Sequence, residues 1–300
     1  MIRRNLLYFM FYCLLTLSWL NGQEPAAIVL SVQGQAYFGN VSLCTGSVIR
    51  SGDSLRLSGK SQLRMLLRNG KVETQLRSGV FRSSPLTDST LQTIFASSEN
   101  IDRWYQLISV QPKTSVRASE EALTLVFPRN SSLLDKPAKL SWQTELDGPY
   151  ECSLRCYEDD FSYDAECSQD NLVLMEDPFI SEGKTYFWYA RPLNTDLSAL
   201  PPASWFKVLS QEDRTRLENE LGLLTATLEA DTASVAFKLL KCNILLNFEL
   251  HHDVLTQLDE VLSVEPTNKV AHIYRALTCE RMDLDMQSRN ALQMVGRLSH

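Results

Sequence analysis

The chain has 300 residues, a formal net charge of −7 and a hydrophobic fraction of 44%. An acidic chain without a block of Lys or Arg residues disfavours a nucleic-acid or anionic-membrane partner. The apolar content, with modest Gly and Pro, excludes a largely disordered chain, and the length predicts two or three domains.

Residues 1–22 have the pattern of a secretory signal peptide. Two arginines near the start are followed by an apolar run from Leu6 to Leu20 and a short polar exit that ends at Gly22. The run is shorter than the ~20 residues of a membrane-spanning helix, so cleavage is favoured, with an uncleaved anchor as the alternative. We therefore expect the rest of the chain to be periplasmic or secreted and, once the leader is cleaved, not to span the membrane.

Residues 24–83 are predicted to form a small all-β module. Residues 28–32 are predicted to form a strand, and apolar and polar residues alternate from residue 62 to 68, broken only by Leu66, as in a strand with one buried face. The pair Asn69-Gly70 is typical of a tight hairpin turn, because both residues tolerate a positive φ. The stretches that carry the glycine-punctuated pattern are Val32-Gln33-Gly34, Ile49 to Leu55, Ser61 to Met65 and Asn69-Gly70. They resemble the FecR-type β-domain of bacterial envelope proteins, which implies a ligand-binding module in envelope sensing.

Residues 84–121 are predicted to form a helical linker, because apolar residues between Leu91 and Leu107 follow a helical spacing. Residues 122–210 are predicted to form a β-sandwich, because short strands recur between Pro, Gly and Asp residues. The most informative stretches are Phe127 to Ser132, Leu140 to Trp142, Tyr150 and Gly183 to Trp188. These stretches are similar to fibronectin-type-III-like modules of secreted bacterial proteins.

In that resemblance Trp142 is the core tryptophan, and Tyr186 and Trp188 share one face of a late strand. We interpret Tyr186 and Trp188 as core residues as well. The alternative is an aromatic platform for carbohydrate, which requires Trp188 or Trp205 to be exposed.

Residues 211–300 are predicted to be helical. Ser210 with two acids after it is a favourable helix start, and helices are expected at 234–248, 253–264, 270–282 and 285–298. Pro266-Thr267-Asn268 separates two helical pairs that are offset by about 34 residues. This arrangement resembles the tetratricopeptide repeat, which implies a concave surface for a protein partner.

Six cysteines follow the predicted signal peptide, an even number in a compartment where disulfides persist. They are Cys44, Cys152, Cys156, Cys167, Cys242 and Cys279. A hairpin centred near residues 161–162 sets Cys156 opposite Cys167, so we predict a disulfide between them. The pairing of Cys152 with Cys167 is the alternative and requires a bulge or a longer excursion of the chain.

The sequence contains no recognisable catalytic or metal-binding set. We expect the adjacent His251 and His252 to be solvent-exposed at the tip of a helical hairpin, a poor geometry for one metal. We expect the acidic residues from Glu158 to Glu166 to form a solvated loop, because their spacing does not fit a calcium-binding loop.

These features predict a multidomain β and α protein without enzymatic activity, cofactor or bound metal. Its predicted role is that of a secreted or periplasmic binding or scaffold protein that contacts protein partners through its helices. The alternatives are an envelope sensing component and a carbohydrate- or cell-wall-binding protein.

Overall fold

The computed structural model describes residues 25–75 except 53, 78–80, 94–98, 100–101, 104, 123–174, 180–193, 203–228 and 232–298. The predicted signal peptide lies outside the described residues, as does most of the predicted linker at 84–121. The chain divides into two compact units, with the boundary after Leu91. It is a mixed β and α protein with several sheets and a helical C-terminal region.

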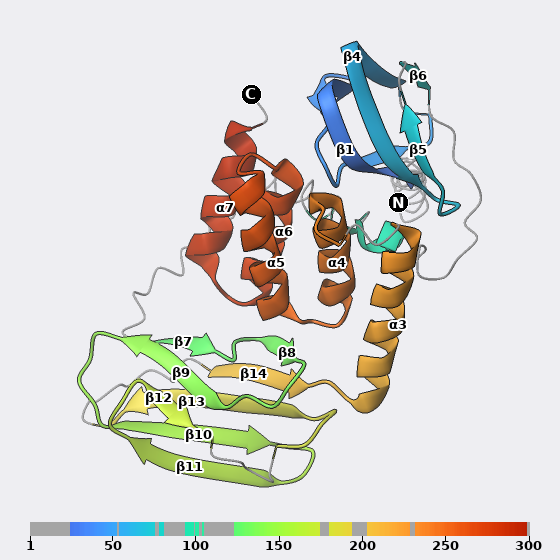
Figure 1. Ribbon diagram of the computed structural model, residues 1–300. Coiled ribbons are helices and arrows are strands. Elements are labelled where there is room, and N and C mark those ends of the chain that lie inside the picture. Colours follow the sequence, from blue (N-terminus) through green and yellow to red (C-terminus); the bar gives the residue numbers. More distant parts are fainter. Residues whose placement is uncertain are drawn as a thin grey trace, which may run out of the picture. The chain divides into compact units, whose positions relative to one another are not determined.

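The first unit is an antiparallel sheet built on two long strands, β1 (Pro25–Phe38) and β4 (Ser54–Leu67), which pair along most of their length (Figure 1). The shorter strands are β2 (Val41–Ser42), β3 (Val48–Arg50), β5 (Val72–Gln75) and β6 (Gly79–Val80). The β4–β5 hairpin turns at Asn69-Gly70, and Gly70 has a φ of 78°, which confirms the predicted turn.

The register between β1 and β4 shifts at Gly34, where a bulge places three residues of β4 opposite this one residue of β1. Gly34 has a φ of 81°, which glycine adopts readily and other residues do not. A β-carbon at this position would also collide with the hydroxyl of Ser61. The same hydroxyl accepts a hydrogen bond from the backbone N–H of Gln35 at 2.8 Å, so the close approach holds the bulge in place.

The second unit begins with two sheets. The order of the five-stranded sheet is β11–β10–β13–β14–β8, and that of the three-stranded sheet is β12–β9–β7. The described strand pairs are antiparallel, except that β8 runs parallel to β14. The strands are β7 (Leu123–Phe127), β8 (Ser131–Leu133), β9 (Lys139–Thr144), β10 (Tyr150–Cys156), β11 (Phe161–Cys167), β12 (Asn171–Val173), β13 (Thr185–Pro192) and β14 (Ala203–Val208).

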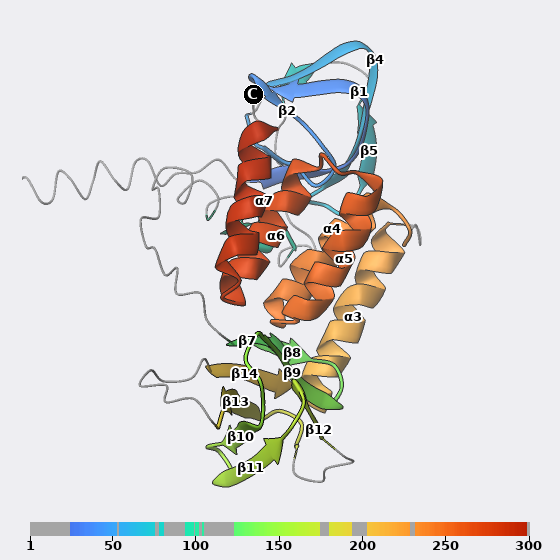
Figure 2. The same cartoon turned by 90° about the vertical axis from the view of Figure 1, so that its left-hand side faces the viewer.

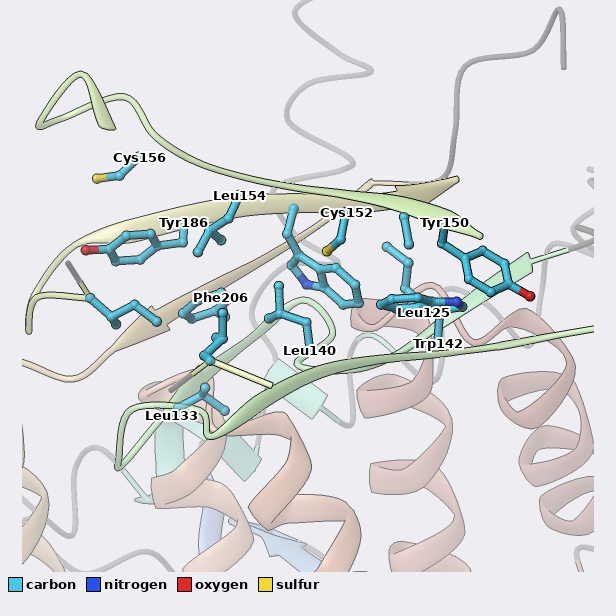
Figure 3. Close-up of a cluster of buried hydrophobic side chains, with 14 of the residues drawn as sticks. Leu125, Leu133, Leu140, Trp142, Tyr150, Cys152, Leu154, Cys156, Tyr186 and Phe206 are labelled. Atoms are coloured by element: carbon cyan, nitrogen blue, oxygen red, sulfur yellow. The ribbon is translucent and has the colours of Figure 1, made fainter. Parts of the chain in front are cut away.

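The two sheets share one hydrophobic core, to which both contribute alternate residues (Figure 3). Trp142 of β9 is 2% exposed, Trp188 of β13 is 1% exposed and Tyr186 is fully buried, which confirms their interpretation as core residues. The indole of Trp188 donates a hydrogen bond to the carbonyl oxygen of Pro128 at 2.9 Å. The hydroxyl of Tyr186 accepts a hydrogen bond from the backbone N–H of Ser181 at 2.8 Å, so the polar atoms of both side chains have defined partners.

The C-terminal part consists of α3 (Gln211–Thr227), α4 (Val235–Asn247), α5 (His251–Val264), α6 (Lys269–Arg281) and α7 (Asp285–Arg297). Each helix packs beside the next in chain order (Figures 1 and 2). Ser210, Ser234 and Asn268 cap the starts of α3, α4 and α6 through their side-chain oxygens, as their positions predict. Within the described residues, no helix is both long and apolar enough to cross a membrane.

Candidate functional site

A short helical segment at residues 94–98 is held by the side chains of α4. Asn243 donates a hydrogen bond from Nδ2 to Ser98 Oγ at 2.9 Å, and Ser97 Oγ donates to Asn247 Oδ1, also at 2.9 Å. The two asparagines lie one helical turn apart, so their amides line one side of α4. The helices thus hold a stretch of chain that is about 150 positions away in the sequence.

Apolar burial and a second helix complete this contact. Phe95, beside the two serines in the segment, is only 2% exposed. Asn243 itself is 1% exposed, and its Oδ1 accepts a hydrogen bond from the hydroxyl of Tyr274 in α6 at 2.8 Å. The amide therefore connects α4, α6 and the bound segment, and its orientation is fixed by both partners. We call Asn243, Asn247 and Tyr274 the amide clamp.

The amide clamp was not predicted, because residues 234–248 were expected only to form a helix and the partner of Asn243 lies far away in the sequence. A signal was present, since Asn243 interrupts a run in which Leu239, Leu240, Ile244 and Leu245 are all apolar. A polar side chain in such a run must be hydrogen-bonded to be tolerated in a core.

A second polar cluster lies where the loop between β7 and β8 meets the ends of the helices. The guanidinium of Arg129 donates from Nε to the carbonyl oxygen of Met282 at 2.6 Å and from Nη2 to that of Asp283 at 2.8 Å. A third hydrogen bond is donated from Nη1 to the carbonyl oxygen of Leu125 at 2.7 Å. Since Met282 and Asp283 follow α6, the positive charge lies at the negative end of the helix dipole.

The next residues of the same loop contact the start of α5. The hydroxyl of Ser131 accepts a hydrogen bond from the backbone N–H of His251 at 3.0 Å, and the side-chain amide of Asn130 donates to Asp283 at 2.7 Å. The backbone N–H of Ser132 donates to the carbonyl oxygen of Glu249 at 2.8 Å. We call these loop residues and their helical partners the sheet–helix junction.

Both histidines belong to this junction, so the expectation that they are exposed at a hairpin tip is wrong. His251 is 2% exposed and donates from Nδ1 to the carbonyl oxygen of Asn130 at 2.5 Å. Nε2 of His252 accepts a hydrogen bond from the backbone N–H of Arg129 at 3.1 Å. The helix begins at His251 rather than at residue 253, because the loop packs over the turn and shields it from water.

Burial keeps both imidazoles neutral. It lowers the pKa of His252 to about 4, with a further contribution from the neighbouring charge of His251. Burial also lowers the pKa of His251, although its hydrogen bond to Asn130 acts in the opposite direction. Neutral rings at the N-terminus of α5 also avoid placing positive charge at the positive end of the helix dipole.

The predicted disulfide between Cys156 and Cys167 does not fit the observed hairpin. The register pairs Cys156 with Phe161 and Cys167 with Tyr150, so the two cysteines lie at opposite ends of the β10–β11 pair. Six residues along a strand span about 20 Å, far beyond the reach of a disulfide. Both thiols are free, as are the other described cysteines.

The acidic stretch is mostly strand rather than loop. Only residues 157–160 form the turn, and Asp164 and Glu166 lie on β11 and point outwards. Asp164 forms an ion pair with Arg155 at 2.8 Å, and Asp159 pairs with Lys184. Among the described residues, no group of three or more His, Cys, Asp or Glu side chains is arranged to hold a metal ion.

The first unit carries a shallow hollow of about 380 Å³. Its lining residues are Tyr37, Asn40, Arg56, Leu57, Ser58 and Ser78. Arg56 donates a hydrogen bond from Nη2 to the carbonyl oxygen of Gly39 at 2.5 Å, which holds the guanidinium against the β1–β2 turn. The hollow thus combines one cation with several hydroxyl and amide groups, and none of its lining residues is acidic.

A comparison of the chain with models of known protein families finds no match, and a comparison with curated protein sequences also finds none.

Proposed function

We propose that the chain is a non-enzymatic, secreted or periplasmic binding protein that holds protein partners on its helical hairpins. In this proposal residues 24–83 are a FecR-like module, residues 122–210 a fibronectin-III-like sandwich and residues 211–300 tetratricopeptide-like hairpins. The helical pairs α4–α5 and α6–α7, offset by about 34 residues, support the last of these.

The observation that carries the proposal is the contact between the amide clamp and residues 94–98. A helical surface that holds a segment of chain through two side-chain amides has the chemistry of peptide recognition. Because an amide both donates and accepts, the clamp matches hydroxyl and peptide groups rather than charged ones.

Site-specific photo-crosslinking in the native cell tests this proposal. A photoreactive residue in place of Asn247, the exposed member of the clamp, is expected to trap a defined protein partner. A control probe at Val264, which is 68% exposed and outside the clamp, is expected not to trap it. Identical products from both positions, or none from Asn247, would contradict the proposal.

The hollow in the first unit favours envelope sensing as the second candidate function. Its single cation and its hydroxyl groups suit a small hydroxylated carboxylate. A thermal-shift screen of such acids with the full chain is expected to give a stabilising ligand whose effect disappears in Arg56→Ala and persists in Lys60→Ala. Equal shifts in both variants would exclude the hollow as the binding site.

A further inference from the structure

The outer face of the five-stranded sheet carries aromatic residues on neighbouring strands. Tyr186 and Phe206 point into the core (Figure 3), and side chains alternate along a strand. Phe187 and Trp205 therefore lie on the opposite face, and the register makes them direct neighbours across β13 and β14. Both are at least partly exposed, so two rings from adjacent strands face the solvent together.

Two tyrosines extend this aromatic face. The ring of Tyr157 lies 5.5 Å from that of Phe187, and these side chains are 76% and 40% exposed. Tyr189 lies two positions after Phe187 on the same side of β13 and is also partly exposed. A cluster of aromatic rings in contact with water is uncommon on a protein surface that has no ligand.

The polar groups beside the rings are paired with one another. Arg155, in register with Phe187, forms a two-pronged ion pair with Asp164 at 2.8 and 2.9 Å. Arg191 forms a second pair with Glu151 across β13 and β10. The polar groups of Ser153 and Arg155 beside Asp164 lower the pKa of its carboxyl, so the first pair stays charged at neutral pH.

The two ion pairs limit the class of partner that can bind this aromatic face. The charges within each pair cancel, and Glu166, in register with Glu151, adds a negative charge at the edge of the face, so an anionic partner is disfavoured. The ion pairs nevertheless present both donors and acceptors beside flat apolar rings. A neutral β-linked sugar chain matches this combination, because the C–H faces of each sugar are apolar and its edges carry hydroxyl groups.

We propose that the aromatic face, defined by Tyr157, Phe187, Tyr189 and Trp205 and flanked by the two ion pairs, binds a neutral β-linked polysaccharide. The rings stack on the sugar faces, and the paired arginines and carboxylates bind the hydroxyl groups. This site is separate from the amide clamp, so it adds a second binding activity to the proposed role in protein binding.

Binding of the full chain to two neutral β-linked oligosaccharides, chitohexaose and cellohexaose, tests the proposal. At least one probe is expected to bind and to change the tryptophan fluorescence, because Trp205 is partly exposed whereas Trp142 and Trp188 are buried. Trp205→Ala and Phe187→Ala are expected to weaken binding by about tenfold or more, which corresponds to about 1.4 kcal/mol. Trp205→Phe is expected to retain most of the affinity.

Controls separate a lost site from a lost fold. Met286→Ala, at a residue that is 72% exposed on α7, is expected to bind like the wild type. Near-ultraviolet circular dichroism reports whether the packing of Trp142 and Trp188 survives in each variant. Absence of binding to both oligosaccharides, or unchanged binding in correctly folded Trp205→Ala and Phe187→Ala, would overturn the proposal. Sedimentation that shows these residues joining two copies of the chain would overturn it as well.

Discussion

Protonation of His252 is incompatible with the hydrogen bond that it accepts from the backbone of Arg129. A proton on Nε2 would point at an N–H group and place charge in a buried site at the positive end of α5. The junction therefore requires the neutral ring of His252, and the stability of the junction depends on pH.

We expect the free energy of unfolding to fall as the solution is acidified from neutral pH. The pKa of His252 is 6.5 in an ordinary environment and about 4 in the folded chain, so below pH 6.5 the unfolded chain binds protons more readily. The contribution of this residue is complete above pH 6.5 and is lost between there and about 4. At pH 5 the loss is about 2 kcal/mol.

Urea unfolding of the wild type and of His252→Gln at pH 7 and pH 5 measures this effect. The glutamine retains a hydrogen-bond acceptor but does not titrate, so its stability is expected to fall less between the two pH values. Equal losses in both proteins would show that other groups, such as carboxylates, cause the acid sensitivity.

The cysteines differ in how far their thiols are available for reaction. Burial, with a smaller contribution from the nearby Cys167, raises the pKa of Cys152 to about 12. Cys44 and Cys167 are partly exposed, whereas Cys152, Cys156, Cys242 and Cys279 are buried. Because the thiolate is the reactive form, iodoacetamide is expected to modify Cys44 and Cys167 in the native protein and to spare the buried four.

Peptide mapping after a brief reaction, with a fully unfolded sample as the reference, checks this expectation. Rapid modification of Cys156 in the native protein would mean that the β10–β11 pair opens in solution.

The β10–β11 hairpin shows why one element was predicted with the wrong register. The acidic residues suggested a loop, yet Phe161, Tyr163, Ala165 and Cys167 alternate with polar residues, as in a strand with one buried face. Their charged neighbours are accommodated because they point outwards and form ion pairs. The alternation of apolar and polar side chains with a period of two therefore predicted the strand better than the local density of acidic residues did.

A side-chain cap fixes the start of α6. Asn268 accepts a hydrogen bond from the backbone N–H of Ala271 at 2.9 Å, and its amide donates to Glu265 at 2.7 Å. In contrast, α5 has no side-chain cap, and its start depends on the distant loop at residues 129–131. Such a start cannot be predicted from neighbouring residues alone.

Asn268→Ala is expected to destabilise the protein by about 1–2 kcal/mol, because α6 loses its cap and the residue is buried. Thr267→Ala, at the exposed neighbouring position, provides the control and is expected to change stability by less than about 0.5 kcal/mol. Thermal unfolding followed by circular dichroism at 222 nm distinguishes the two variants. Equal midpoints would show that other contacts position the start of α6.

At the scale of the whole molecule, local pattern predicted the β segments, the helices and most of the core. It did not predict how these parts join. In the sheet–helix junction, Arg129 and Asn130 contact residues more than 150 positions away in the sequence. Contacts at such separations produce no periodic pattern of apolar and polar residues. The amide clamp was missed for the same reason.

Arg129→Ala is expected to weaken the coupling between the sheets and the helices of the second unit. Three charge-assisted hydrogen bonds to carbonyl oxygens are lost, and we expect a destabilisation of about 3 kcal/mol. Near-ultraviolet circular dichroism for the sheet core and far-ultraviolet circular dichroism for the helices should then give separate unfolding transitions.

Arg275→Ala, which removes an ion pair with Asp259 on the helix surface, is the matched control and should keep the transitions together. Coincident transitions in Arg129→Ala would show that the remaining contacts of the junction are sufficient.

The parallel pairing of β8 with β14 also constrains the order in which the second unit can form. Strand β8 has no partner until Phe206, 75 positions after Ser131, has been synthesised. The hydrogen bond from the backbone N–H of His251 to the hydroxyl of Ser131 can form only later still. During synthesis from the N-terminus, the edge of the five-stranded sheet therefore stays open until the C-terminal third has emerged. A nascent chain that stalls before this point exposes an unpaired strand edge, which other extended segments can join.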